Sequence, residues 1–255
     1  MKTFKLFTCM LFIVMATDYS KGQVPHFLTP QEAPIDTIFI GSPPEYGSLL
    51  FAYDLAMYEW GKSVRNTERG RQAVQDADAS AENLCAVFSD AFGYSLSKSQ
   101  TPEIYRLILY MKEDVGAYAT QASKSTLRVR PFVLMGQASA VPDQEKDLRD
   151  TGSFVSGHAA IGIAVSMVLA YLNPSKQNLI FKRGMDFGTS RIITGYHYYS
   201  DVRAGQIVGA LTIPALMNNP AFQEQLAKAK AEFQKMSEKR LALQPRTRKL
   251  PRGVD

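Results

Sequence analysis

A nearly uninterrupted apolar run of helical length, Ala159 to Leu172, sets the first limit on the fold of this chain. A helix that is apolar on every side has to be buried, because none of its faces suits water. The run is shorter than the roughly 20 residues needed to span a bilayer, and no later run reaches that length. The sequence therefore predicts a buried core helix here and not a membrane span.

Other segments also carry helical patterns. Thr101 is a capping residue and Pro102 suits the first helical position, which predicts a helix from Pro102 to about Ser125. Residues 48–64 predict another helix, and residues 181–217 predict two helices that flank a turn at Ser190-Arg191. A last amphipathic helix has one apolar stripe, formed by Phe222, Leu226, Ala229, Phe233 and Met236. No strand alternation or internal repeat appears, so we expect an all-α fold, a helix-bundle core with no substantial sheet.

A polar segment at the start of the apolar run has the composition of an anion site. Ser156 can cap the helix, and Gly157 lets an anion approach the backbone N–H groups that a helix start leaves unpaired. His158 follows, where an imidazolium can protonate an oxygen that leaves with an alcohol. On these residues alone, a capped helix with a structural histidine is an equal alternative.

A second polar segment contains another of the three histidines of the chain. Asp201 follows His197 by four residues, so on a helix the two side chains share a face. Asp201, or a neighbour that it orders, can then hold one ring nitrogen while the other attacks phosphorus. Arg191 and Arg130 offer guanidinium forks that match phosphate oxygens. Residues 136–152 read as a loop that links Arg130 to the first segment and shapes a pocket rim. The pattern predicts phosphoryl transfer without a metal, because the arginines supply the neutralising charge.

With these residues in view, the chain resembles the bacterial class A non-specific acid phosphatases. They belong to the phosphatidic acid phosphatase type 2 superfamily, which also contains the vanadium haloperoxidases. The family pattern Ser-Arg, five residues, His, three residues, Asp is complete here from Ser190 to Asp201. The family's Pro-Ser-Gly-His segment is present as Val155 to His158, with Val in place of Pro. Flanking segments such as Tyr58 to Gly61 also look like that family, and the resemblance covers roughly residues 40–237. It implies the helix bundle of the acid phosphatase and haloperoxidase type.

The family's first motif, a Lys, six residues and Arg-Pro, is incomplete. Counting back from Arg130 puts Ser123 at the position of the phosphate-binding Lys, and Lys124 is the next residue. Lys124 can substitute for it, a helix irregularity can restore the register, or the site can work with two arginines. We favour Lys124, whose flexible stem recovers part of the offset. Arg128 is expected to form a structural ion pair rather than to bind the ligand.

The residues and the resemblance together predict hydrolysis of phosphate monoesters through a phosphohistidine. Neutral His197 attacks phosphorus, Asp201 holds and charges its ring, and His158 protonates the leaving alcohol and later activates water. We expect no metal and no cofactor. The expected phosphate-binding residues are Arg130, Ser156, Gly157, Arg191 and, as a substitute at the Lys position, Lys124.

Three other functions stay open at this stage. A nucleotide pyrophosphatase or apyrase would use similar chemistry, and only relative rates on mono-, tri- and pyrophosphates separate it. A vanadate-dependent haloperoxidase would use nearly the same cage, and a non-catalytic phosphate-binding exported protein would keep the seat alone. Small phosphate monoesters are the expected partners, nucleotides among them, and the oligomeric state stays open.

The two ends of the chain predict export and carry the positive charge. Residues 1–22 have Lys2 and Lys5 before an apolar stretch and then small residues, the pattern of a cleavable signal peptide. We therefore expect a periplasmic or secreted protein, a single acid phosphatase domain over residues 23–237 and a basic, mobile tail over residues 238–255. The ends account for more than the net charge of +5. The body is therefore close to neutral, and it indicates no dedicated nucleic-acid partner.

Cysteine usage excludes an internal disulfide in the exported chain. Cys9 would leave with the signal peptide, and Cys85 is the other cysteine. Many members of the resembled family carry a cysteine pair at the positions of Ala140 and Thr194, and both are missing here.

Overall fold

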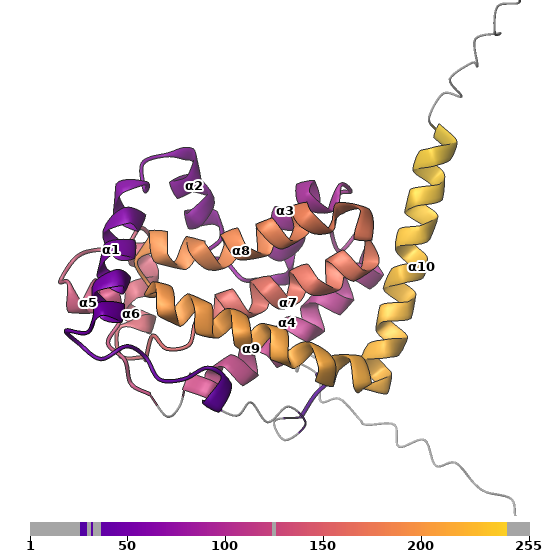
Figure 1. The fold of residues 1–255 in the computed structure, drawn as a ribbon. Coiled ribbons are helices and arrows are strands. Elements are labelled where there is room, and N and C mark those ends of the chain that lie inside the picture. Colours follow the sequence, from indigo (N-terminus) through magenta and orange to yellow (C-terminus); the bar gives the residue numbers. More distant parts are fainter. Residues whose placement is uncertain (1–25, 30–31, 33–36, 124–125, 244–255) are drawn as a thin grey trace, which may run out of the picture.

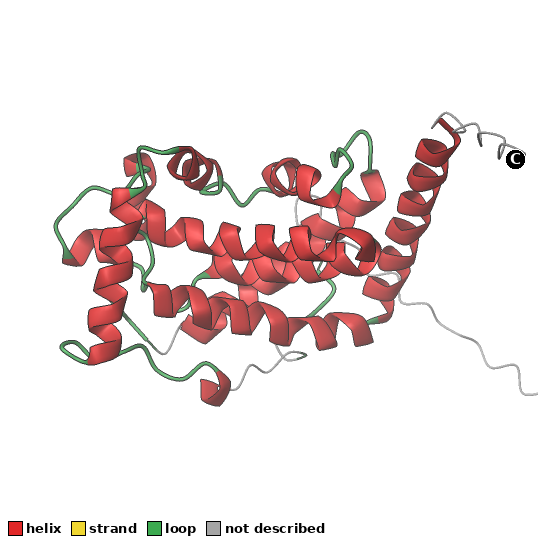
Figure 2. Cartoon of the chain, turned by 45° about the horizontal axis from the view of Figure 1, so that its top comes forward, coloured by secondary structure: helices red, strands yellow, loops and turns green. Residues whose placement is uncertain are grey.

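The structure is a computed structural model that describes residues 26–29, 32, 37–123 and 126–243. Over these ranges the chain forms helices and loops and no strand (Figure 2), so the predicted all-α fold is confirmed. The expected signal peptide and Lys124 lie outside the described residues. The long helices are α1 (Leu49–Ser63), α3 (Ala81–Phe92), α4 (Pro102–Ser123), α7 (Gly157–Leu172), α8 (Gln177–Thr194), α9 (Tyr199–Asn218) and α10 (Pro220–Leu243). Shorter ones are η1 (Thr37–Phe39), α2 (Glu68–Gln75), α5 (Pro131–Leu134), η2 (Pro142–Gln144), α6 (Glu145–Leu148) and η3 (Pro174–Lys176).

The predicted core helix, α7, lies at the centre of the bundle. It packs against α8, α9 and α4, and Figure 1 shows these helices running along one another with α10 across one end. Its side chains are buried on nearly every side, as the apolar run predicts. None of the helices in the described ranges has the length and apolar character needed to cross a bilayer. The C-terminal helix α10 continues to Leu243, past the expected domain end at residue 237.

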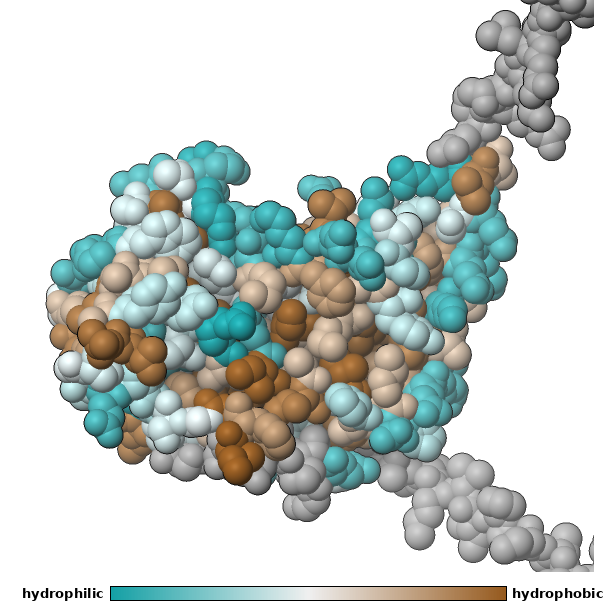
Figure 3. Space-filling view, in the orientation of Figure 1, coloured by the Kyte–Doolittle hydropathy of each residue, from teal (hydrophilic) through white to brown (hydrophobic). Residues whose placement is uncertain are grey.

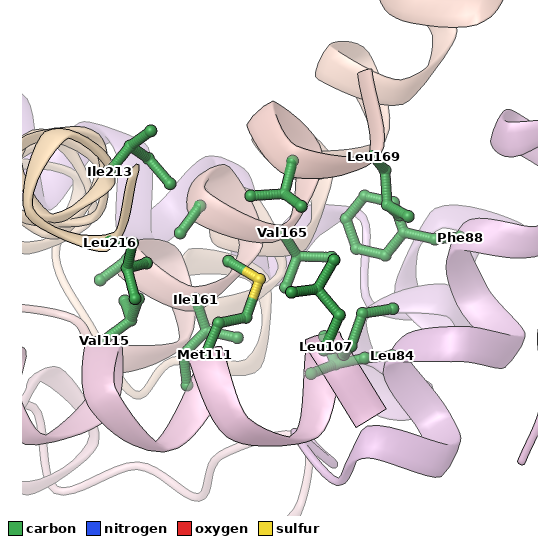
Figure 4. Packing of buried hydrophobic residues seen from close by; sticks show 14 of the residues in the cluster. Leu84, Phe88, Leu107, Met111, Val115, Ile161, Val165, Leu169, Ile213 and Leu216 are labelled. Carbon is green, nitrogen blue, oxygen red and sulfur yellow. The ribbon is translucent and has the colours of Figure 1, made fainter. Parts of the chain in front are cut away.

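Helices α3 and α4 pack apolar side chains against one side of α7. Figure 4 shows Leu107 and Met111 of α4 facing Ile161 and Val165 of α7, with Phe88 of α3 closing the end. All five side chains are buried, and burying an aliphatic or aromatic side chain of this size contributes roughly 1.5–3 kcal/mol. This packing gives α7 a fixed position, and the polar segment at its N-terminus inherits that position.

Helix α4 begins at Pro102 as predicted, but its cap comes from elsewhere. The Thr101 hydroxyl binds Ser97. The backbone N–H groups of Glu103 and Ile104 donate to the carboxylate of Glu232 in α10, at 3.2 and 3.0 Å. The cap is therefore a tertiary contact, which local sequence cannot reveal.

The turn predicted at Ser190-Arg191 is wrong. Both residues belong to the last turns of α8, and the chain reverses at Gly195, whose φ of 85° is left-handed. Glycine adopts this conformation without strain, and the Gly195 N–H caps the helix. His197 therefore lies in the short link between α8 and α9, and not on a helix face shared with Asp201.

The expected loop over residues 136–152 contains the short helices η2 and α6. It is fixed to α8 where the backbone N–H of Ala140 donates to the carbonyl of Thr194 at 2.9 Å. These are the two positions of the missing cysteine pair, so a backbone hydrogen bond joins the segments there. Cys85 is a buried free thiol.

Some apolar side chains remain on the surface. Leu49 and Leu50, at the start of α1, are largely exposed. Figure 3 shows apolar side chains interspersed with hydrophilic ones on one face of the molecule. Scattered exposed apolar residues are normal for a folded protein and need no special role.

Candidate active site

The predicted polar segments meet in the fold and line one cavity of about 590 Å³. Four of the predicted site side chains reach it, from three parts of the chain: Arg130, His158, Arg191 and His197. Gly157 and Ser123 also line it, whereas Ser156 and Asp201 are buried behind the wall. The rest of the wall comes from α4 and from the loop that contains α6, namely Ala119, Thr120, Gln144, Asp147, Leu148, Thr151, Gly152 and Val155.

The contacts of His197 fix which ring nitrogen is free. Nδ1 lies 2.7 Å from the carbonyl oxygen of Ser153, which only accepts, so Nδ1 carries the proton. Nε2 therefore keeps the lone pair, which accepts a hydrogen bond from Arg130 Nη1 at 3.2 Å in the free enzyme. Burial, with a contribution from Arg130, lowers the pKa of His197 to about 4. The ring is thus neutral over most of the acidic range, as a nucleophile requires.

Asp201 lies close to His197 but is not its first hydrogen-bond partner. Its Oδ2 is 3.7 Å from Nδ1, whereas the Ser153 carbonyl is 2.7 Å away. Asp201 Oδ2 instead accepts from the backbone N–H of Tyr198 at 2.8 Å, which closes the start of α9. The Asp201 carbonyl accepts from the backbone N–H of Ser156 at 3.0 Å. Asp201 therefore supplies a nearby negative charge and joins α9 to the start of α7.

Arg128 forms the structural ion pair that the sequence predicts. Its guanidinium binds Asp201 at 2.5 Å and Asp54 of α1 at 2.7 Å, and all three side chains are buried. Ser200 completes the cluster by donating to Asp54 from its backbone and its hydroxyl. Burial opposes the charge on Asp201, but contacts with His197 and Arg128 hold its pKa below the usual value. Asp201 thus stays ionised beside the histidine.

Asp54 and Ser153 were missed by the sequence interpretation. Asp54 is a charged residue on an otherwise apolar helix segment, and such a position signals a buried ion pair. Ser153 acts through its backbone carbonyl, which carries no signal in the side-chain pattern.

Arg130 links the cavity loop to His197. Its Nη2 donates to the Thr151 hydroxyl and the Gly152 carbonyl, both at 3.0 Å, and its Nε donates to the carbonyl of Leu148 at 3.1 Å. Nη1 faces His197 and also donates to the carbonyl of Tyr196 at 3.1 Å. Burial lowers the pKa of Arg130 to about 10, so the guanidinium is still charged in acidic and neutral solution.

Arg191 lines the same cavity and has side-chain donors without a partner in the described part of the chain. The side chain is buried, and its Nε and Nη1 have no hydrogen-bond partner within the described ranges. Its guanidinium lies over the ring of Tyr196, 4.5 Å from the centroid. Burial lowers the pKa of Arg191 to about 9, which leaves it charged below neutrality. Because leaving a buried charged donor unpaired is costly, these atoms are suited to an anion.

The start of α7 forms another part of the wall. The Ser156 hydroxyl accepts from the backbone N–H of Ala159 at 3.3 Å, so Ser156 is the predicted N-cap. Gly157 opens the helix and lines the cavity. The positive end of the helix therefore faces the same space as the two arginines.

His158 is held by two contacts on its outer side. Its Nε2 lies 3.0 Å from the carbonyl of Ala77, and its ring stacks on Phe187 with 5.9 Å between centroids. Because a carbonyl only accepts, Nε2 carries the proton and Nδ1 is left for proton transfer. Burial, and next to it the charge of Arg191, lowers the pKa of His158 well below its usual value.

Ser190 and Ser123, the residue at the family's Lys position, both use their hydroxyl groups in contacts within the protein. The Ser190 hydroxyl donates to Asp76 at 2.6 Å and does not reach the cavity. Ser123 lines the cavity at the end of α4, and its hydroxyl donates to the Thr120 carbonyl at 2.9 Å. Over the described ranges, no group of three or more His, Cys, Asp or Glu side chains has the arrangement of a metal site.

Comparison with known proteins agrees with this geometry. Residues 114–224 match the model of the PAP2 superfamily. A non-specific acid phosphatase of Providencia stuartii is 45% identical over 212 residues, which cover 83% of this chain and 86% of the relative. A non-specific acid phosphatase of Salmonella typhimurium is 36% identical over 87% of this chain and 89% of its own length. An acid phosphatase of Zymomonas mobilis is 31% identical over 90% of each chain. The chain therefore belongs to the PAP2 superfamily and, within it, to the non-specific acid phosphatases.

Proposed function

We propose that this protein is an exported acid phosphatase that hydrolyses phosphate monoesters through a covalent phosphohistidine on His197, without a metal. The observation that carries the proposal is that Arg191, with two buried donors that have no partner in the described ranges, lines the same cavity as His197, whose Nε2 keeps its lone pair. A phosphoryl group has three oxygens to accept from such donors and an electrophilic phosphorus for the nitrogen.

In the first step, His197 Nε2 attacks phosphorus and forms the P–N bond while the ester P–O bond breaks. Arg191 and the N–H groups at the start of α7 bind the oxygens over which negative charge spreads, and Arg130 joins them by turning onto an oxygen the Nη1 donor that faces His197 Nε2 in the free enzyme. Asp201 opposes the positive charge that develops on the imidazole, as its placement 3.7 Å from Nδ1 allows. His158 gives its Nδ1 proton to the departing alkoxide, so the alcohol leaves neutral.

In the second step, water attacks the phosphohistidine. Neutral His158 takes a proton from the water, the P–N bond breaks and its electron pair returns to Nε2 of His197. Inorganic phosphate then leaves the arginines. The same imidazole thus serves as acid and then as base, which requires that its pKa respond to the bound phosphoryl group.

The pKa of His158 differs between the empty site and the site with a bound monoester. In the free enzyme, burial and next to it the charge of Arg191 lower the pKa of His158. A bound monoester dianion pairs with Arg191 and Arg130 and removes their repulsion, so it raises the pKa of His158. The substrate therefore favours the protonated acid that its own cleavage needs.

The signal-peptide pattern of residues 1–22 supports export. The cavity volume of about 590 Å³ leaves space beside a phosphate for a leaving group, so nucleoside monophosphates are included among the proposed substrates.

A phosphomonoesterase assay of the exported protein tests the proposal. We expect release of phosphate from p-nitrophenyl phosphate in acidic buffer, unchanged by a chelator. Pyrophosphate and nucleoside triphosphates are assayed separately as substrates of the alternative phosphohydrolases. Halide oxidation with added vanadate is assayed as the test of a haloperoxidase. Loss of activity with the chelator, or faster turnover of pyrophosphate than of every monoester, would contradict it.

A further inference from the structure

A buried charged cluster lies behind His158, outside the cavity. Asp76, which follows α2, is fully buried and accepts from Arg183 of α8 through both carboxylate oxygens. The Ser190 hydroxyl also donates to Asp76, at 2.6 Å. Arg69 of α2 in turn donates to the Ser190 oxygen at 2.9 Å. Ser190 thus uses its hydroxyl on this cluster and not on the ligand.

The cluster fixes α2 to α8. Helix α2 buries only Gly70 and Ala73 of its eight residues, so apolar packing gives it little hold on the bundle. Figure 1 shows α2 lying over α8, and the two helices are in contact. Polar contacts therefore hold the end of α2 in place against α8. They are made by Arg69 of α2 and by Asp76, the residue after the helix.

The end of α2 is where His158 is held. Ala77 directly follows Asp76, and its carbonyl is the 3.0 Å partner of His158 Nε2. This contact fixes the tautomer in which Nδ1 is left for proton transfer. It is also the one contact acting on the pKa of His158 that favours the protonated ring, against burial and the charges of Arg191, His197 and Arg130.

We propose that Asp76 and Ser190 are positioning residues for the general acid: they hold the Ala77 carbonyl where it orients His158. This inference rests on the proposed function, because it requires His158 to protonate the leaving group.

Leaving-group dependence separates this role from a purely structural one. A p-nitrophenyl group leaves as a stable phenolate and needs little protonation, whereas an alkyl group such as that of glycerol phosphate leaves as an alkoxide and needs the acid. The ratio kcat/KM covers the steps through leaving-group departure. A misplaced His158 therefore lowers kcat/KM for the alkyl ester much more than for the nitrophenyl ester.

The experiment compares kcat/KM for these two esters in wild type, Asp76→Asn and Ser190→Ala. We expect both variants to lose about 10- to 100-fold on glycerol phosphate, the scale of a misplaced catalytic group, and far less on p-nitrophenyl phosphate. Ser190→Ala keeps the Asp76–Arg183 pair, so it carries the test where Asp76→Asn does not fold by circular dichroism. Equal losses on both esters, or none, in folded protein would overturn the inference.

Two further variants complete the comparison. Asp114→Asn is the matched control, because Asp114 of α4 is a buried carboxylate whose partners are His26 and the backbone N–H groups of Phe27 and Leu28, and it makes no hydrogen bond to His158 or to the Asp76 cluster. It should leave the ratio between the two esters unchanged. His158→Ala should show the selective loss in full. If it does and the Asp76 and Ser190 variants do not, the positioning role alone fails. If it shows no selectivity, the acid role of His158 in the proposed function fails as well.

Discussion

The two histidines in the cavity differ in exposure and in partners, since His197 is buried and His158 is partly buried. His197 has a carbonyl on one nitrogen and a guanidinium near the other, whereas His158 has a carbonyl on Nε2 and a phenyl ring against its face. These surroundings leave a lone pair on His197 and a titrating nitrogen on His158. The proposed division into nucleophile and acid thus depends on which ring nitrogen each backbone carbonyl occupies, and the placement of these carbonyls needs the whole fold.

The pH dependence of activity follows from these two residues. Below a pH of about 4, His197 becomes protonated and loses its lone pair, so kcat/KM should fall on the acid side with an apparent pKa near that value. As pH rises, His158 loses its proton and the rate falls again. Because bound phosphate raises the pKa of His158, the alkaline limb of kcat should lie at higher pH than that of kcat/KM.

Initial rates from pH 3 to 10 with one alkyl ester measure both limbs. The maximum should lie on the acid side of neutrality. A profile that still rises above pH 9 in the presence of a chelator would exclude these roles.

The third cation is a question of one position. Ser123 lines the cavity, and Lys124 is the residue that we expect to supply the charge. A charge-assisted contact contributes about 1.5–3 kcal/mol, so Lys124→Ala should lower kcat/KM roughly ten- to a hundredfold if the contact forms in the transition state. Ser123→Lys alone should add little. A silent Lys124→Ala together with a strong gain from Ser123→Lys would show that this site works with two arginines.

At the scale of elements, the site depends on how closely α9 approaches α7. A Cβ atom on Gly205 would lie 2.2 Å from the carbonyl oxygen of Ser156, and one on Gly209 would lie 2.2 Å from that of Ala160. Both distances are impossible without movement of the backbone. The glycines of α9 therefore let the start of α7 lie against the helix that carries Asp201.

Gly205→Ala should displace the Ser156 segment and with it Gly157 and His158. We expect a loss of about 1–3 kcal/mol in the free energy of unfolding, the usual cost of overpacking, and a loss of kcat/KM. Gly116→Ala is the matched control, since a Cβ there meets only Ile161 at 3.8 Å. That helix substitution should be neutral or stabilising by about 0.4–1 kcal/mol. Urea denaturation with parallel assays measures both effects, and equal behaviour of the two variants would refute the packing argument.

At the scale of the whole molecule, the helices were easier to predict from the sequence than the contacts between them. The apolar run predicted α7 and the apolar stripe predicted α10, because burial of a continuous stripe is a local property of the sequence, and Pro102 predicted the start of α4. The end of α8 was misplaced, although Gly195 was available as a helix stop signal. The cap by Glu232 and the ion pair of Arg128 with Asp54 join distant segments, and no local pattern contains them.

Motif spacing picked out Arg130, His158, Arg191 and His197, which the structure brings to one cavity, whereas the geometry of these residues was not predicted. Spacing indicated that His197 and Asp201 act together. It suggested a shared helix face, but the structure puts His197 in a link and gives its Nδ1 to the Ser153 carbonyl. Motif spacing thus indicates which side chains meet in the cavity, whereas the main-chain groups that orient them leave no mark in the side-chain pattern.

Trapping of the covalent intermediate tests the central claim, that His197 Nε2 attacks phosphorus. Wild type and His197→Ala are mixed with a ³²P-labelled monoester, quenched in alkali and analysed for protein-bound phosphate before and after acid treatment, with circular dichroism as the control for folding. We expect alkali-stable, acid-labile label on wild type and neither label nor turnover in folded His197→Ala. Normal labelling of His197→Ala, or label on wild type that resists acid, would contradict it.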